Sequence, residues 1–119
     1  MVIEDDTAVR HLIAEILRDA GHGVLECDSA EDALSSLDSA HPDLIGLDLA
    51  LPFMDGLEFL RLLRSRRDTA HVPVLAISAA PQDLLFQLSD EVQGIIAKPF
   101  HLDQLLDSVA RALNLPEPA

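Results

Sequence analysis

The sequence has few of the residues that mark several common classes of protein. It contains one cysteine, Cys27, and neither tryptophan nor tyrosine. A single thiol cannot form an internal disulfide, and it does not provide the spacing of a cysteine-ligated metal site. No run of about eighteen apolar residues is present, nor a charged leader followed by an apolar stretch. We therefore expect no membrane span and no signal peptide, and we expect a cytoplasmic location.

Basic residues are also scarce. Eight Lys and Arg stand against 21 Asp and Glu, for a net charge of −13. Because phosphate backbones attract Lys and Arg, this balance argues against direct nucleic-acid binding by the domain. Four of the arginines lie within positions 61–67, a grouping typical of a solvated helix face. The only lysine is Lys98, and it directly precedes Pro99.

The size of the chain fits one globular domain. A length of 119 residues with an apolar fraction of 49% is enough to bury a core but too short for two domains. We assign residues 1–114 to this domain and residues 115–119 to a C-terminal tail or the start of a linker.

Short apolar runs alternate with segments of helical periodicity along the chain. The runs predict strands at 1–3, 24–27, 43–47, 72–77 and 94–97. Helices are expected at 7–20, after Ser29, at 56–67, from Pro81 and at 102–113. Strict alternation predicts an α/β fold, with an open five-stranded parallel sheet and helices on both faces.

Charged and polar groups follow four of the predicted strands. Glu4 and Asp5 follow the first, Asp48 the third, Ser78 the fourth and Lys98 the fifth. In a parallel sheet these ends share one edge, where such folds place their ligands. Crowded carboxylates need a countercharge, and Mg²⁺ prefers oxygen ligands. Carboxylates, a hydroxyl, a lysine and Mg²⁺ together suit a phosphoryl group, which a carboxylate can attack.

Four motifs resemble those of the receiver domain of bacterial two-component response regulators, which has the CheY-like fold. They are V-I-E-D-D at 2–6, D-L-I-G-L-D-L-A-L-P-F-M-D-G at 43–56, V-P-V-L-A-I-S-A at 72–79 and A-K-P-F at 97–100. The resemblance covers essentially the whole chain. It implies a flavodoxin-like three-layer sandwich with strand order 2-1-3-4-5.

The resemblance also implies a role for each strand-end group. Asp48 is the expected phosphoacceptor, Ser78 the switch hydroxyl and Lys98 the partner of the phosphoryl group. Mg²⁺ is the expected cofactor. Its implied ligands are Glu4, Asp5, Asp48 and the backbone carbonyl of Ala50. The peptide bond before Pro99 is expected to be cis, and Gly56 is the expected turn glycine after the acceptor.

The implied function is phosphoacceptance in two-component signal transduction. A histidine kinase or a histidine phosphotransfer protein would donate the phosphoryl group in a phosphorelay. The resulting change of conformation would regulate an effector protein or domain, and a homodimer is compatible with this role. No membrane partner is expected, and no enzyme activity beyond self-phosphorylation and self-dephosphorylation.

Three departures from the family pattern leave the chemical groups of the site in place, and two of them concern the output. Ile95 stands where an aromatic residue usually swings inward. Ser78 and Lys98 are 20 positions apart (98 − 78), fewer than is usual. The first strand has only three residues before Glu4, which predicts a chain that was trimmed or starts late.

Two alternatives remain open. One is a pseudo-receiver that does not switch and serves as a protein-interaction or dimerisation module. The other is a metal-dependent phosphatase with an aspartyl nucleophile, although such enzymes usually have a second Asp where Ala50 stands.

Overall fold

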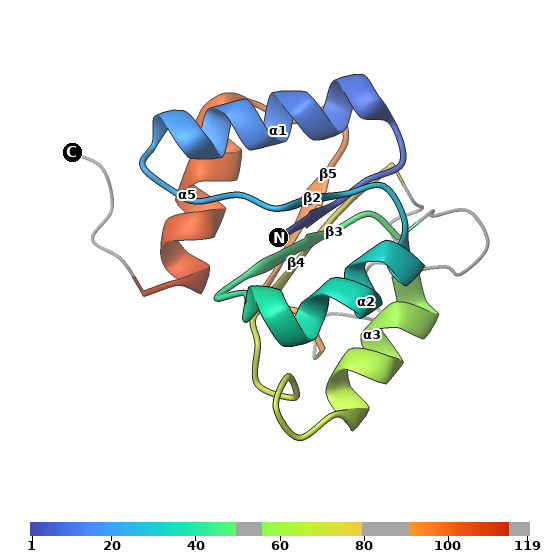
Figure 1. Ribbon diagram of the computed structural model, residues 1–119. Coiled ribbons are helices and arrows are strands. Elements are labelled where there is room, and N and C mark those ends of the chain that lie inside the picture. The colour runs from blue at the N-terminus through green and yellow to red at the C-terminus, as the bar shows by residue number, and fades with distance from the viewer. Residues whose placement is uncertain (50–55, 80–90, 115–119) are drawn as a thin grey trace.

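The computed structural model describes residues 1–49, 56–79 and 91–114. Within these ranges, five strands form one parallel sheet in the order β2-β1-β3-β4-β5 (Figure 1). The predicted strand order and α/β class are therefore confirmed. The strands are β1 (Val2–Ile3), β2 (Glu26–Cys27), β3 (Ile45–Leu47), β4 (Val74–Ser78) and β5 (Gly94–Ala97).

Helices cover both faces of the sheet (Figure 1). On one face lie α1 (Thr7–Asp19) and α5 (Leu102–Ala112), which contact each other. On the other face lie α2 (Ala30–Ala40) and α3 (Gly56–Ser65), which also contact each other. The helix predicted from Pro81 falls outside the described residues, as does the tail at 115–119. None of the helices in the described ranges is long and apolar enough to cross a membrane.

Local sequence signals set the helix ends. The Asp6 side chain accepts a hydrogen bond of 3.0 Å from the Val9 N–H at the start of α1. Ser29 accepts one of the same length from the Asp32 N–H at the start of α2. Gly21 follows α1 with a φ of +98°, a left-handed conformation that glycine adopts without a steric penalty.

Several strands are shorter than the apolar runs predicted. The run at 24–27 pairs only over Glu26–Cys27, and the run at 43–47 only over Ile45–Leu47. Both flank β1, which is two residues long and pairs from Val2 onward. Strand bounds depend on a hydrogen-bonded neighbour as well as on the apolar pattern. β2 is as long as its pairing with β1, and β3 is as long as its pairing with β4.

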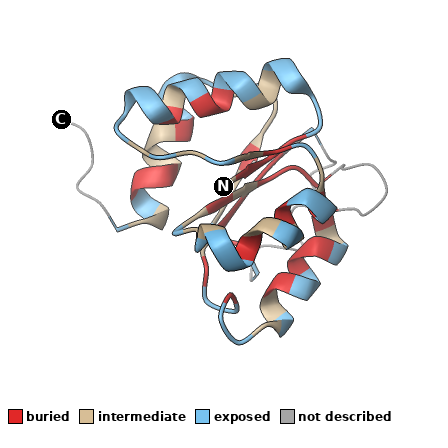
Figure 2. Cartoon of the chain, viewed as in Figure 1, coloured by how far each residue is buried: buried red, intermediate tan, exposed pale blue. Residues whose placement is uncertain are grey.

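The core consists of two clusters, one on each face of the sheet. Strand residues alternate between them: Val2 packs with the α1/α5 cluster, and Ile3 packs with the α2/α3 cluster. Figure 2 shows the strands buried and the outward faces of the helices exposed. A sheet buried on both faces holds the carboxyl ends of its strands rigidly, and those ends carry the predicted site.

Candidate functional site

Two buried carboxylates lie side by side at the carboxyl edge of the sheet. Glu4 follows β1 and Asp48 follows β3, and the register that pairs Ile3 with Leu47 brings them together. The Asp48 N–H donates to the Ile3 carbonyl at 3.0 Å, which holds the backbone of this pair in place. The side chains are only 4% and 7% exposed, respectively.

Asp5 completes an acidic cluster. One carboxylate oxygen from each of Glu4, Asp5 and Asp48 lies within 4.8 Å of the other two. Asp5 is exposed, whereas its two neighbours are buried. The cluster is thus open on the side of Asp5, and three oxygens at this spacing can bind one small cation.

Lys98 brings a positive charge to the two buried carboxylates. It follows β5, and its Nζ atom lies 2.5 Å from Glu4 Oε1 and 3.4 Å from Asp48 Oδ2. Burial alone lowers the pKa of Lys98, but the Glu4 and Asp48 carboxylates outweigh this and raise the pKa above its ordinary value. The lysine therefore remains charged.

The negative charge in the cluster exceeds what Lys98 neutralises. Burial, together with the adjacent Asp48 carboxyl group, raises the pKa of Glu4 to about 8, and Lys98 offsets this only in part. Glu4 Oε2 is fully buried and has no hydrogen-bond partner within the part of the chain that the structure describes. A buried carboxyl oxygen without a partner is costly. A proton shared with Asp48, which the raised pKa favours, satisfies it when no metal is bound, and a hard divalent cation would satisfy it in the ionised form. The residues present therefore fit Mg²⁺.

Of two further predicted members of the site, the structure describes one in part and the other not at all. Ser78 ends β4 and pairs with Ala97, the residue before Lys98, so its backbone lies at the same edge. Its side chain lies outside what the structure describes. Ala50, whose carbonyl was predicted to bind Mg²⁺, falls outside the described residues altogether.

The structure shows a contact that the sequence prediction missed. One terminal nitrogen of the Arg10 guanidinium donates to the Glu4 carbonyl oxygen at 3.0 Å. Arg10 Nε lies 3.4 Å from Glu26 Oε1, and the Arg10 side chain is 12% exposed. Arg10 therefore connects α1 and β2 to the backbone of the acidic pair. The sequence carried one signal for this contact, namely an arginine in the helix that follows the acidic pair, in a chain with few basic residues.

Gly56 is required for a steric reason. A Cβ atom on Gly56 would lie 2.6 Å from Leu49 Cα and 2.8 Å from the Asp48 carbonyl oxygen. The Gly56 N–H also donates to the Leu49 carbonyl at 3.1 Å. Gly56 was predicted as a turn glycine, but it is the first residue of α3, and the close approach of α3 to the backbone of Asp48 leaves no room for a side chain there.

The end of β5 also follows the prediction. The Lys98–Pro99 peptide bond is cis. Ile95, which stands in place of the usual aromatic residue, is half-buried and packs against the α2/α3 cluster.

Comparison with known proteins agrees with this geometry. The family model of the response regulator receiver domain matches residues 1–110. The chain belongs to this family.

The receiver domain has relatives among full-length regulators and solved structures. It is 35% identical to the response regulator protein FleR of Pseudomonas aeruginosa, over 93% of this chain and 24% of FleR. It is 33% identical to the transcriptional regulatory protein PhoP of Escherichia coli, over 89% of this chain and 48% of PhoP. The receiver domain thus spans about a quarter of FleR and about half of PhoP.

Among solved structures, the chemotaxis protein CheY4 of Vibrio cholerae superimposes with a TM-score of 0.87. It is 25% identical, over 94% of this chain and 95% of that one. The CheY-like fold expected from the sequence is therefore confirmed.

Proposed function

We propose that Asp48 of this receiver domain accepts a phosphoryl group from a phosphohistidine on a histidine kinase or a phosphotransfer protein. The observation that carries this proposal is the cluster of Glu4, Asp5 and Asp48 carboxylates with the Lys98 ammonium beside it. Glu4, Asp5 and Asp48 would hold Mg²⁺, and the family resemblance adds the Ala50 carbonyl.

The proposed step is an in-line displacement at phosphorus. One Asp48 carboxylate oxygen forms the new O–P bond while the P–N bond to the imidazole breaks, and the imidazole leaves with the electron pair and takes up a proton. Lys98 Nζ, 3.4 Å from Asp48 Oδ2, is placed to neutralise a phosphoryl oxygen. Bound Mg²⁺ would neutralise further charge on the phosphoryl group.

The acyl phosphate would change the charge at one edge of a rigid sheet. It introduces oxygen acceptors where Lys98 is now held mainly by Glu4, at 2.5 Å. We propose that Lys98 and the Ser78 hydroxyl turn toward the phosphoryl group, and that this biases a two-state equilibrium read by an effector. The receiver domain is proposed to act in the cytoplasm and not to turn over external phosphate esters.

The direct test is intact-mass spectrometry after incubation with acetyl phosphate and Mg²⁺. We expect one phosphoryl adduct on the wild type, and none on Asp48→Asn or after chelation of Mg²⁺. Asp43→Asn is a matched control, because Asp43 precedes β3 and lies beside the pocket at the opposite edge of the sheet. An adduct of equal yield on Asp48→Asn would disprove the proposed acceptor.

The half-buried Ile95 favours a second candidate, a pseudo-receiver that binds partners without switching. The two candidates differ in their response to a phosphoryl analogue. A switching domain should show widespread changes in amide chemical shifts with beryllofluoride and Mg²⁺. A pseudo-receiver should show changes confined to the residues around Asp48, or none.

A further inference from the structure

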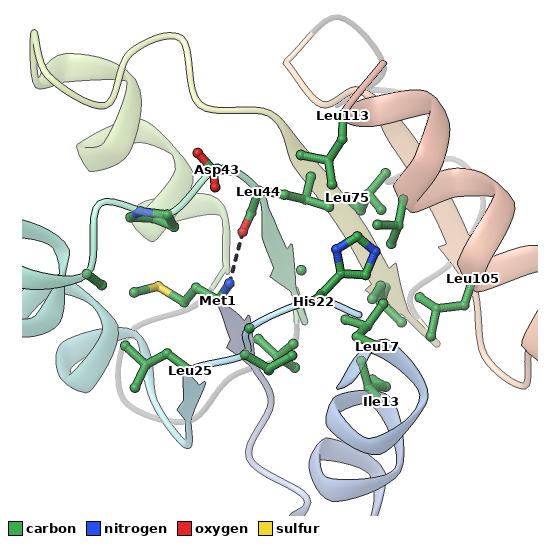
Figure 3. Close-up of a pocket in the computed structure, with 18 of the residues that line it drawn as sticks. Met1, Ile13, Leu17, His22, Leu25, Asp43, Leu44, Leu75, Leu105 and Leu113 are labelled. Atoms are coloured by element: carbon green, nitrogen blue, oxygen red, sulfur yellow. Dashed lines mark hydrogen bonds between the residues drawn. The ribbon is translucent and has the colours of Figure 1, made fainter. Parts of the chain in front are cut away.

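A charged groove lies at the amino edge of the sheet, beside the end of α3. It has a volume of about 620 Å³, and the residues that line it include Arg61, Arg64, Ser65, His71, Glu91 and Gln93. They belong to α3 and to the segments that lead into β4 and β5. The pocket in Figure 3, which Met1 lines, is at the same edge but lies between the sheet and the helices α1 and α5. The groove is therefore a separate site.

The groove gathers positive charge in an acidic chain. The whole chain has eight basic residues against 21 acidic ones. Two arginines and a histidine line the groove, however, together with a single carboxylate, that of Glu91. Arg61 and His71 are exposed. Within the described ranges neither of them forms an ion pair. Their charge and hydrogen-bonding groups are therefore available to a ligand.

Backbone hydrogen bonds hold Arg64 in place without neutralising it. One terminal nitrogen of its guanidinium donates to the Val72 carbonyl at 2.7 Å and to the Ala70 carbonyl at 3.1 Å. The other donates to the Glu91 carbonyl at 3.0 Å. Carbonyl oxygens carry no formal charge, and a guanidinium does not lose its proton in proteins. Arg64 thus provides a fixed positive charge at the base of the groove.

Gln93 fixes the opposite wall. Its side-chain oxygen accepts from the Val74 N–H at 2.7 Å, and its backbone N–H donates to the Val74 carbonyl at 2.9 Å. Together with Arg64, it ties the segment before β4 to the segment before β5. A site that is already ordered loses less conformational entropy when a ligand binds.

Size and charge together define the ligand that the groove fits. Sites of roughly 300–1,000 Å³ hold ligands of many atoms, so the groove has room for a short peptide segment and not only for one ion. Arginine binds carboxylates through paired N–H donors, and Arg61 and Arg64 share one face of α3. Nucleic acid fits less well, because its charge would extend past the groove onto a chain of net charge −13.

We propose that this groove binds a short acidic segment of a partner protein. Carboxylates of that segment pair with Arg61 and Arg64, and the Ser65 hydroxyl and the His71 ring donate further hydrogen bonds. The Glu91 carboxylate repels the segment and so limits the affinity. This interaction is independent of the phosphoryl chemistry at the carboxyl edge of the sheet.

The test is an NMR titration of the 119-residue chain with a short peptide of alternating Glu and Asp. A peptide of the same length made of Gln and Asn is the uncharged control. We expect the acidic peptide alone to shift the amide signals of residues 61–65, 70–72 and 91–93. Arg61→Gln should weaken its binding about threefold, the effect of one exposed charge pair. Arg67→Gln removes an exposed arginine that does not line the groove, and it should leave the affinity unchanged.

Glu91→Gln should have the opposite effect. It removes the repelling carboxylate and keeps the backbone carbonyl that binds Arg64. We therefore expect the acidic peptide to bind about threefold more tightly, whereas mere loosening of this segment would weaken binding.

Several outcomes would overturn the proposal. They are an absence of shifts with the acidic peptide, equal binding of the uncharged peptide, and equal losses from Arg61→Gln and Arg67→Gln. Inorganic phosphate that produced the same shifts at equal affinity would reassign the groove to a small anion. A DNA oligonucleotide that did so would reassign it to nucleic acid.

Discussion

Lys98 is bound more closely to Glu4 than to Asp48. Its Nζ atom lies 2.5 Å from Glu4 Oε1 and 3.4 Å from Asp48 Oδ2. This contact connects the end of β5 to the end of β1, across two intervening strands of the sheet. The lysine therefore stabilises the fold and also supplies the positive charge beside the proposed acceptor.

Removal of the Lys98 charge should destabilise the domain and make its stability depend on Mg²⁺. Lys98→Met leaves Glu4 buried beside Asp48 without a cation, and we expect a loss of about 1–3 kcal/mol in the free energy of unfolding. Mg²⁺ should restore more stability to this variant than to the wild type. Urea unfolding with and without Mg²⁺ measures both effects. Arg67→Met, at an exposed position, is the control and should show neither effect.

Stability without added metal should fall as the pH rises toward 8. The folded-state pKa of Glu4 is raised from 4.5 to about 8, so the folded chain binds more protons than the unfolded chain between these values. The resulting stabilisation is fully present below 4.5 and is lost as the pH rises through about 8. Glu4→Gln should reduce the slope in this window. The check is urea unfolding of both proteins across the window, and identical slopes would contradict the assignment.

The affinity for Mg²⁺ should depend on pH with the opposite sign. A cation at the cluster requires ionised Glu4, so its binding competes with the proton. We expect the apparent affinity for Mg²⁺ to increase as the pH rises from about 6 to about 8. Calorimetric titration at each pH measures this affinity. Asp48→Asn should weaken binding at every pH, because it removes a proposed ligand.

Gly56→Ala should disturb the site and not only the fold. The added Cβ would overlap the backbone of Asp48 and Leu49, which must move. We expect a loss of stability of about 1–3 kcal/mol and a decrease in Mg²⁺ affinity of about tenfold. Gly21→Ala is the matched control. Its strain comes from a φ of +98°, with no atom within 4 Å of the added carbon, so it should lower stability and leave Mg²⁺ affinity unchanged.

Arg10→Gln should weaken Mg²⁺ binding without removing a ligand. The guanidinium holds the Glu4 carbonyl at 3.0 Å, and its loss should loosen the backbone between β1 and α1. We expect an affinity decrease of about three- to tenfold. Arg18→Gln is the control, since Arg18 also pairs with Glu26, at 3.2 Å, but does not contact Glu4. Equal effects from both variants would show that the salt bridges to Glu26, and not the bond to Glu4, are responsible.

Much of this architecture was predictable from local patterns. Alternating apolar runs and helical stripes predicted the parallel sheet. The residues after β1, β3 and β5 predicted that acidic side chains and Lys98 meet at one edge. The N-cap residues Asp6 and Ser29 each accept a hydrogen bond from the N–H three residues later, a contact within one turn of helix. Such features can be predicted from sequence because a helix cap depends on residues a few positions apart, and a helix or strand depends on the spacing of apolar residues within it.

Other features required the packed structure. Lys98 contacts Glu4 across 94 positions of the chain, and the pocket lined by Met1 brings together residues of α1, β3, β4 and α5. The bond from Arg10 to the Glu4 carbonyl spans only six positions, but it depends on how α1 packs against β1. The shortened strands β2 and β3 have the same origin, since their bounds depend on pairing with β1 and β4, respectively.

The sequence by itself determined the fold class, the strand order through family resemblance, and the set of groups at the carboxyl edge. Only the tertiary structure decided how those groups share their charge. Burial raises the pKa of Glu4, register brings it against Asp48, and the reach of Lys98 selects its closer partner. Desolvation and distance are properties of the packed chain, and no local pattern of residues specifies either.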